Sequence, residues 1–281
     1  MRYIISRVDV KNKCFYTQVG IKEEGFYLSS RLAKLFLPYL SEGTVVGFSI
    51  MPKMRKHLKR LMYQINAFEF IAQTNPYVVV YDFKRLRNEM FKTLSSFDNL
   101  LFLDCEMTMK NFHPNENFVQ QVIQVGYVLA DKKGEVIKLD SYYVKPLKPK
   151  DLNKRTCKFL SLDKEKFFQE AKDFEYFYQD LLTIYNEYKP KIVVWGKNDL
   201  IAIMKGFVIN EKSAFLSESD FVDLLKLHKD FFNLRNDLGL FKAYQIYYLQ
   251  PTEKQAHDAK IDAIITKDIY DAFLLNIKTL V

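Results

Sequence analysis

Hydrophobic and polar residues alternate along much of the first third of this chain, as they do in half-buried strands. The turn-like sequence Lys11-Asn12-Lys13 separates the first two segments and predicts a hairpin. Apolar residues recur at helical spacing over residues 29–40. The predicted strands are residues 3–10, 14–19, 44–50, 61–71 and 77–83. This order predicts a small, mostly β domain, and an OB-like barrel with one helix suits it.

The pattern changes near residue 98, where strands come first and helices then alternate with strands. The predicted strands are residues 100–105, 122–130, 139–144, 191–195 and 221–224, and the predicted helices are residues 174–188, a segment from residue 198, and residues 257–276. The turn Asp131-Lys132-Lys133-Gly134 predicts an antiparallel pair within this set. The order is typical of an α/β domain with a mixed sheet. We therefore expect one domain over residues 1–97 and a second over residues 98–281.

Positive charge is unevenly distributed between these two parts. Residues 1–97 contain 16 Lys and Arg against 7 Asp and Glu, whereas residues 98–281 contain 26 against 27. An excess confined to the first domain indicates a polyanion partner, although solvated surface lysines are the ordinary alternative. The strongest basic cluster, which we expect to contact nucleic acid, is Lys53, Arg55, Lys56, Lys59 and Arg60.

The composition indicates in which cellular compartment this protein is expected. We find no apolar run of the roughly 20 residues that a membrane helix needs, and charge interrupts the first seven residues as it does not in a signal peptide. The three cysteines, Cys14, Cys105 and Cys157, are widely spaced and match neither a disulfide framework nor a zinc motif. We expect a cytoplasmic protein without a membrane partner.

In the second domain, acidic residues lie at the ends of predicted strands and near the starts of predicted helices. Asp104 and Glu106 close the first strand, where a period of two directs both side chains to one face. Two such like charges favour a divalent cation between them. Asp199 follows a later strand at a helix start, a position that a capping residue also occupies. Asp262 lies on the last predicted helix among small residues, five residues after His257.

These motifs, in this order, resemble those of the DEDDh exonuclease family of the RNase H-like superfamily. The first is Asp104-Cys105-Glu106-Met107-Thr108, the second Trp195-Gly196-Lys197-Asn198-Asp199, and the third runs from His257 to Asp262. Weaker similarity joins them at Gln124-Val125-Gly126 and at Tyr143-Val144-Lys145-Pro146, so the resemblance covers about residues 98–276. The segment Met109-Lys110-Asn111 departs from it, because many relatives have glycine there.

The resemblance implies an RNase H-like fold and a metal-dependent reaction. It implies that two divalent ions, Mg²⁺ or Mn²⁺, are held by Asp104, Glu106, Asp199 and Asp262, with Asp104 bridging both. It also implies that His257 is the general base. The product would be a nucleoside 5′-monophosphate released from the 3′ end of single-stranded nucleic acid. Met107 and Thr108 are expected to contact the terminal nucleotide.

Several functions stay open at this point. A 3′→5′ exonuclease acting on RNA is favoured, because the Trp-Gly-x-x-Asp form and the separate basic domain are similar to those of RNA-trimming relatives. A DNA exonuclease of repair or proofreading is the alternative within enzymes. A catalytically weak nucleic-acid-binding protein is the alternative of another class, and recruitment of a protein complex is a further role for the first domain.

Overall fold

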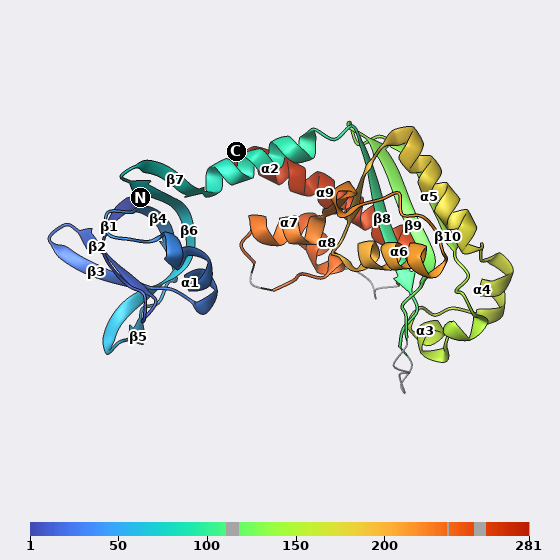
Figure 1. The fold of residues 1–281 in the computed structure, drawn as a ribbon, viewed down its shortest axis with the longest axis horizontal. Coiled ribbons are helices and arrows are strands. Elements are labelled where there is room, and N and C mark those ends of the chain that lie inside the picture. Colours follow the sequence, from blue (N-terminus) through green and yellow to red (C-terminus); the bar gives the residue numbers. More distant parts are fainter. Residues whose placement is uncertain (111–117, 235, 250–256, 281) are drawn as a thin grey trace. The chain divides into compact units, whose positions relative to one another are not determined.

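The computed structural model describes residues 1–110, 118–234, 236–249 and 257–280, so the predicted departure at Asn111 lies outside the described residues. The chain forms two compact units, Met1–Met90 and Phe91–Leu280, each of which is described by itself (Figure 1). The division falls within helix α2 (Phe83–Ser95), a little ahead of the boundary expected at residues 97 and 98. In the described part of the chain, no helix combines the length and the apolar character that a membrane span requires.

The first unit is a closed five-stranded β-barrel. Strands β1, β2 and β3 pair in sequence, β3 then pairs with β6 in parallel, and β6 returns to β1 through β4. Helix α1 (Ser30–Phe36) connects β3 to β4. The strands are β1 (Arg2–Asp9), β2 (Cys14–Val19), β3 (Lys22–Tyr27), β4 (Val45–Ile50), β5 (Arg55–His57), β6 (Arg60–Thr74) and β7 (Tyr77–Asp82), with a 3-10 turn at Leu37–Tyr39. The prediction of a small, mostly β first domain is confirmed, and its strand pairing closes into a barrel.

Aromatic packing and strand bending together close the barrel. Phe15 lies against Phe26, Phe48 and Phe68, with ring centroids 5.4–6.0 Å apart. Register shifts between β4 and β6, at Gly47/Phe48 and at Ser49/Ile50, bend these strands as β-bulges do. Two strands were absent from the sequence-based prediction. They are β3, whose first half is charged and exposed, and β5, which has three residues.

The second unit is a five-stranded mixed sheet flanked by helices, as predicted. The strand order is β10-β9-β8-β11-β12, antiparallel among the first three and parallel from β8 to β12. The strands are β8 (Asn99–Met107), β9 (Val122–Asp131), β10 (Val136–Tyr143), β11 (Lys191–Val194) and β12 (Phe221–Asp223). The helices are α3 (Lys154–Phe159), α4 (Lys164–Glu170), α5 (Phe174–Tyr188), α6 (Asn198–Ile209), α7 (Leu224–Phe231), α8 (Leu240–Tyr248) and α9 (Ala259–Leu280), with 3-10 turns at Pro149–Asp151 and Glu218–Asp220.

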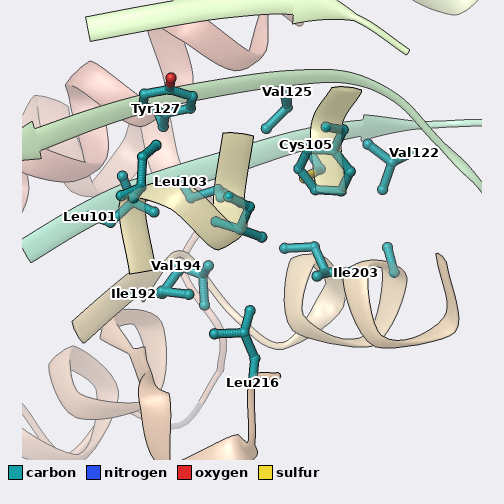
Figure 2. Close-up of a cluster of buried hydrophobic side chains, with 14 of the residues drawn as sticks. Leu101, Leu103, Cys105, Val122, Val125, Tyr127, Ile192, Val194, Ile203 and Leu216 are labelled. Carbon is teal, nitrogen blue, oxygen red and sulfur yellow. The ribbon is translucent and has the colours of Figure 1, made fainter. Parts of the chain in front are cut away.

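Side chains of β8 alternate between two packed faces. Figure 2 shows Leu101, Leu103 and Cys105 in one buried cluster with side chains of β9, β11 and α6. The intervening residues point the other way, because successive side chains of a strand lie on opposite faces. Phe102 there makes an edge-on contact with Tyr270 of α9, with ring centroids 5.3 Å apart. Asp104 and Glu106 therefore share the face that α9 covers.

The beginning of α9 lies directly on β9 at Gly126. A Cβ atom built on this glycine would be 2.2 Å from the backbone carbon of Ala259 and 2.3 Å from the nitrogen of Lys260, so no side chain fits between them. Gly126 is the cross-strand partner of Asp104, and directly paired residues of neighbouring strands share a face. The close approach therefore brings the first turns of α9, including Asp262, beside Asp104.

We predict that Gly126→Ala lowers the free energy of unfolding by about 1–3 kcal/mol, the usual range for overpacking a tight contact. The opposing atoms belong to the α9 backbone and cannot move aside as a flexible side chain would. Denaturant unfolding of the full chain measures the effect. Gly239→Ala is the matched control, because a Cβ there meets nothing within 4 Å and its φ of −65° suits alanine. Equal effects at the two positions would contradict the close packing.

Candidate active site

The end of β8 presents two carboxylates on the α9 side of the sheet. Glu106 is buried, and Asp104 is half-buried. Both side chains project from the part of β8 that is paired with β9, beyond Phe102, which is the last β8 residue paired with β11. The backbone at this position is therefore fixed, and the two carboxylates cannot separate by a shift of the strand.

Asp199 joins the same edge because β11 runs parallel to β8. It is buried at the second residue of α6, immediately after the turn that follows β11. The backbone N–H of Cys105 donates to Asp199 Oδ1 over 3.0 Å. The α6 N-cap is Lys197, and the Asp199 carboxylate accepts from the backbone of its own first turn as well as from Cys105 at the end of β8. The bond from Cys105 aligns a carboxylate of α6 with the two carboxylates of β8.

The start of α9 supplies the last two residues of the predicted site, Asp262 and His257, and the helix cap, Asp258. Asp258 caps the helix, since its Oδ1 accepts from the N–H of Ile261 at 3.1 Å, and its Oδ2 accepts from the side chain of Gln124 on β9 at 3.0 Å. One turn further along, Asp262 is buried, and its Oδ1 has no hydrogen-bond partner in the described part of the chain. His257, just ahead of the cap, is half-buried.

Glu106, His257 and Asp262 form a group in which a metal ion could be held. Each offers one ligand atom, and these atoms lie within 4.8 Å of one another. His257 Nδ1 is 3.9 Å from Glu106 Oε1. The structure thus brings together side chains from β8 and α9 that are far apart in the sequence. Asp104 and Asp199 lie close enough to interact electrostatically with this group.

Burial and mutual repulsion both oppose ionisation of the carboxylates in this site, so their pKa values are raised. Burial, followed by the charges of Asp199, Asp262 and Glu106, holds the pKa of Asp104 well above its usual range. Burial and neighbouring carboxylates raise the pKa of Glu106 to about 7 and that of Asp262 to about 7. Burial also raises the pKa of Asp199, against the Cys105 hydrogen bond. It lowers the pKa of His257, so the imidazole is neutral at pH 7.

These properties fit a divalent cation. Carboxylate oxygens are the donors that Mg²⁺ and Mn²⁺ prefer, and a cation would neutralise charges that otherwise raise one another's pKa. Asp262 Oδ1, a buried acceptor without a donor, is the kind of atom that a metal ligand would be. The cluster contains the donor atoms for a hard ion at a sheet edge. The number and identity of the ions stay predictions.

The other predicted contacts lie in different settings. Met107 packs against the core cluster of Figure 2, and Thr108 is buried, with its hydroxyl accepting from the N–H of Gln121 at 3.0 Å. Thr108 therefore holds the turn after β8, and its contact with a nucleotide stays a prediction. The basic cluster lies in the first unit and all its members are exposed: Arg55, Lys56, Lys59 and Arg60 on the β5–β6 hairpin, and Lys53 just before β5.

Three residues near the site had no role assigned from the sequence. Asp258 and Gln124 together fix the start of α9, and Phe159 stacks on His257 with ring centroids 4.3 Å apart. The capping aspartate has a sequence signal, because it stands just before the last periodic segment. No sequence pattern indicated Phe159, because α3 has only six residues and its segment shows no clear helical period of apolar residues.

Comparison with known proteins identifies solved structures that share the fold of part of this chain. No family model and no curated protein matches the sequence. The nuclease domain of 3′hExo, a DEDDh family member solved with bound rAMP, is similar in structure, with 14% identity and a TM-score of 0.55 over 65% of this chain and 94% of that one. A full-length 3′-exonuclease has 14% identity and a TM-score of 0.53 over 64% and 82%. Cell-death related nuclease 4 has 24% identity and a TM-score of 0.51 over 64% of each chain.

The second unit therefore has the fold of the DEDDh exonucleases, a mixed RNase H-like sheet flanked by helices. The sequence-based resemblance rested on three ordered motifs, and the structure places their acidic residues on β8 and in the first turns of α6 and α9. The RNase H-like fold class predicted for this part of the chain is confirmed.

We predict that without divalent cations the free energy of unfolding falls, by about 1–3 kcal/mol, as the pH rises from about 4 to about 7. The unfolded chain ionises Glu106 and Asp262 near their ordinary pKa values, whereas in the folded chain both pKa values are about 7. The folded state thus binds more protons in this range, and raising the pH removes that advantage. Mg²⁺ should restore the loss, so it should raise Tm more at pH 8 than at pH 5.

Thermal unfolding at both pH values, with Mg²⁺ or with EDTA, measures this effect. Asp262→Asn should flatten the pH dependence and reduce the Mg²⁺ effect. Asp271→Asn is the control, since Asp271 is on the same helix but pairs with Lys267 at 2.7 Å. A Mg²⁺ effect of the same size at pH 5 and pH 8 would speak against cation binding by these carboxylates.

Proposed function

We propose that the protein is a metal-dependent 3′→5′ exonuclease that releases nucleoside 5′-monophosphates from single-stranded nucleic acid, with RNA as the favoured substrate. The observation that carries the proposal is the convergence of Glu106, His257 and Asp262 on one point. Asp104 and Asp199 at the same sheet edge complete the set of residues. The likeness to 3′-exonucleases supports the reaction class.

The proposed roles follow from the chemistry of the side chains. Asp104, Glu106, Asp199 and Asp262 hold two Mg²⁺ or Mn²⁺ ions, which when bound neutralise the phosphate and activate water. His257 is the general base, because burial keeps its imidazole neutral and able to accept a proton from the attacking water. Its position at the rim of the cluster, half-buried and 3.9 Å from Glu106, leaves a ring nitrogen for that proton. Met107 at the end of β8 and Thr108 after it are proposed to contact the terminal nucleotide.

RNA is favoured over DNA for two reasons. The Trp195-Gly196-Lys197-Asn198-Asp199 form of the second motif resembles that of RNA-trimming relatives, and the similar 3′hExo nuclease domain is described with bound rAMP. A DNA exonuclease is the alternative, because contacts to the 2′-hydroxyl decide the choice of sugar. We also propose that the exonuclease domain is residues 98–281, that residues 1–97 are an accessory domain, and that the protein is cytoplasmic, in keeping with three free cysteines.

The first domain is proposed to bind the nucleic-acid backbone through the β5–β6 hairpin. The hairpin ends in a two-residue turn in which Leu58 and Lys59 both have positive φ, as in the tight turns that connect adjacent strands. Four exposed basic side chains are thereby displayed on one ribbon, Arg55, Lys56, Lys59 and Arg60, with the exposed Lys53 just before it. His57 fixes the ribbon to the barrel, since its ring stacks on Tyr27 at 4.7 Å. An OB-type barrel with such a ribbon suits single-stranded substrates.

We predict that the purified chain shortens 5′-labelled RNA stepwise and releases mononucleotides from 3′-labelled RNA, in Mg²⁺ or Mn²⁺ but not in EDTA. Parallel DNA oligonucleotides test the choice of sugar. His257→Ala should reduce turnover about 10²–10⁴-fold, the usual contribution of a general base. Asp104→Asn should reduce it at least as far, because it removes a carboxylate from the metal site.

Matched controls separate chemistry from folding. Asp98→Asn and Asp173→Asn each remove a carboxylate that is largely exposed, at 84% and 77%; both should keep wild-type turnover. A wild-type rate for His257→Ala would exclude its role as base. Binding of oligonucleotides without any metal-dependent cleavage would favour the catalytically weak binding protein instead.

We predict that Lys53→Gln combined with Lys56→Gln weakens binding of single-stranded oligonucleotides and flattens the dependence of log K on log salt concentration. Each lost phosphate contact should reduce the slope by about 0.7. Fluorescence anisotropy from about 50 to 200 mM salt measures it, in EDTA so that nothing is cleaved. The matched control is Lys22→Gln with Lys34→Gln, two exposed lysines of the same barrel outside the hairpin. Equal slopes for both pairs would remove the hairpin from substrate binding.

A further inference from the structure

His257 lies outside the regular part of its helix. The first residue of α9 is Ala259, and the capping residue is Asp258, so helical hydrogen bonds do not fix the orientation of the His257 ring. Its Nδ1 lies 3.9 Å from Glu106 Oε1, which is too long for a hydrogen bond. The contact that does fix the plane of the ring is aromatic: the Phe159 ring is stacked on it, with centroids 4.3 Å apart and an interplanar angle of 30°.

Phe159 is itself held at a defined place by α3. It is the last residue of that helix, whose N-cap is Asn153. The Asn153 side-chain amide donates to the Met109 carbonyl oxygen at 2.6 Å, and the Met109 N–H donates to the Thr156 hydroxyl at 2.9 Å. Thr156 is fully buried. The short helix is thus hydrogen-bonded to the segment that immediately follows β8.

These contacts form a continuous path from the carboxylates to the histidine. Met109 lies three residues after Glu106, so α3 is tied to the strand that carries Glu106. Phe159 then transmits the position of α3 to the His257 ring. The Phe159 side chain is 47% exposed, although apolar side chains of this size are ordinarily buried. Its contribution to the hydrophobic core is therefore small.

We infer that Phe159 is a positioning residue that holds the His257 imidazole against the acidic cluster, in the orientation required to accept a proton. The inference rests on the proposed nuclease function. A flat aromatic ring restricts the imidazole plane without donating or accepting a hydrogen bond, so both ring nitrogens stay available. Phe159 does not need to touch substrate or metal for this role.

Phe159→Ala should lower kcat about tenfold and leave KM nearly unchanged, because it removes the stacking contact and not a substrate contact. Phe159→Tyr and Phe159→Trp should restore kcat, since both present a flat ring. Phe159→Leu, which is apolar but not aromatic, should not. The matched control is Tyr176→Ala. Tyr176, on α5, is also 47% exposed and also contacts another ring, that of Tyr142 on β10. This substitution should leave kcat unchanged.

A double-mutant cycle distinguishes positioning from a separate effect. In a His257→Ala background, Phe159→Ala should cause no further loss, because there is no imidazole left to orient. Independent losses that multiply would overturn the inference. An increased KM with unchanged kcat would also overturn it, since that result would place Phe159 against a nucleotide base.

Nuclear magnetic resonance tests the contact without any reaction. The His257 Hε1 signal, assigned by its absence in His257→Ala, should lie upfield from the ring current of Phe159 and move downfield in Phe159→Ala and Phe159→Leu. An unmoved signal would exclude the stacking. If no nucleic acid is cleaved by the wild-type chain, the proposed function fails while this measurement still reports on the contact. If His257→Ala is inactive and Phe159→Ala is fully active, the positioning role alone fails.

Discussion

Repulsion among buried carboxylates is the constraint on which the second unit depends. Burial, and then the charge of neighbouring carboxylates, raises the pKa of Asp104, Glu106, Asp199 and Asp262, so each is held in place against an electrostatic penalty. The fold meets that penalty with rigid supports. β8 is hydrogen-bonded on both edges, Asp199 accepts from the backbone of Cys105, and α9 lies so close to β9 at Gly126 that a single methyl group would not fit. A large apolar core on the opposite face of the sheet stabilises this arrangement.

The sequence predicted the features that arise from local periodicity or from spacing within a motif. Alternation along β8 placed Asp104 and Glu106 on one face, and the structure has them there, because a strand has no freedom in the direction of successive side chains. Asp199 was open to reading as a helix cap, and only the fold shows its bond to Cys105. The mutual position of α9 and β9 could not be predicted from composition, since one contact between Gly126 and Ala259 determines it.

Elements fixed by distant partners were the ones that the sequence did not reveal. β3 begins with charged, exposed residues, and it is a strand because it pairs with β2 and, across the closure of the barrel, with β6. Helix α3 is too short to show a period, and its position depends on hydrogen bonds from Asn153 and Thr156 to Met109. In both cases the interaction that fixes the element joins segments that are remote in sequence. The local pattern of apolar and polar residues therefore could not predict it.

The site divides its chemical tasks between two kinds of support. The four carboxylates come from a strand and from the first turns of two helices, which suits ligands that must keep fixed distances while they repel one another. His257 lies on irregular backbone before α9, and the Phe159 ring that is stacked on it restrains the plane of its imidazole. A proton acceptor must change its charge during a reaction, and a contact that restrains its plane while leaving its nitrogens free permits that change. Under the proposed function, the rigid sheet would fix the positions of the metal-binding carboxylates, and α3, through Phe159, would fix the position of the proton-accepting ring.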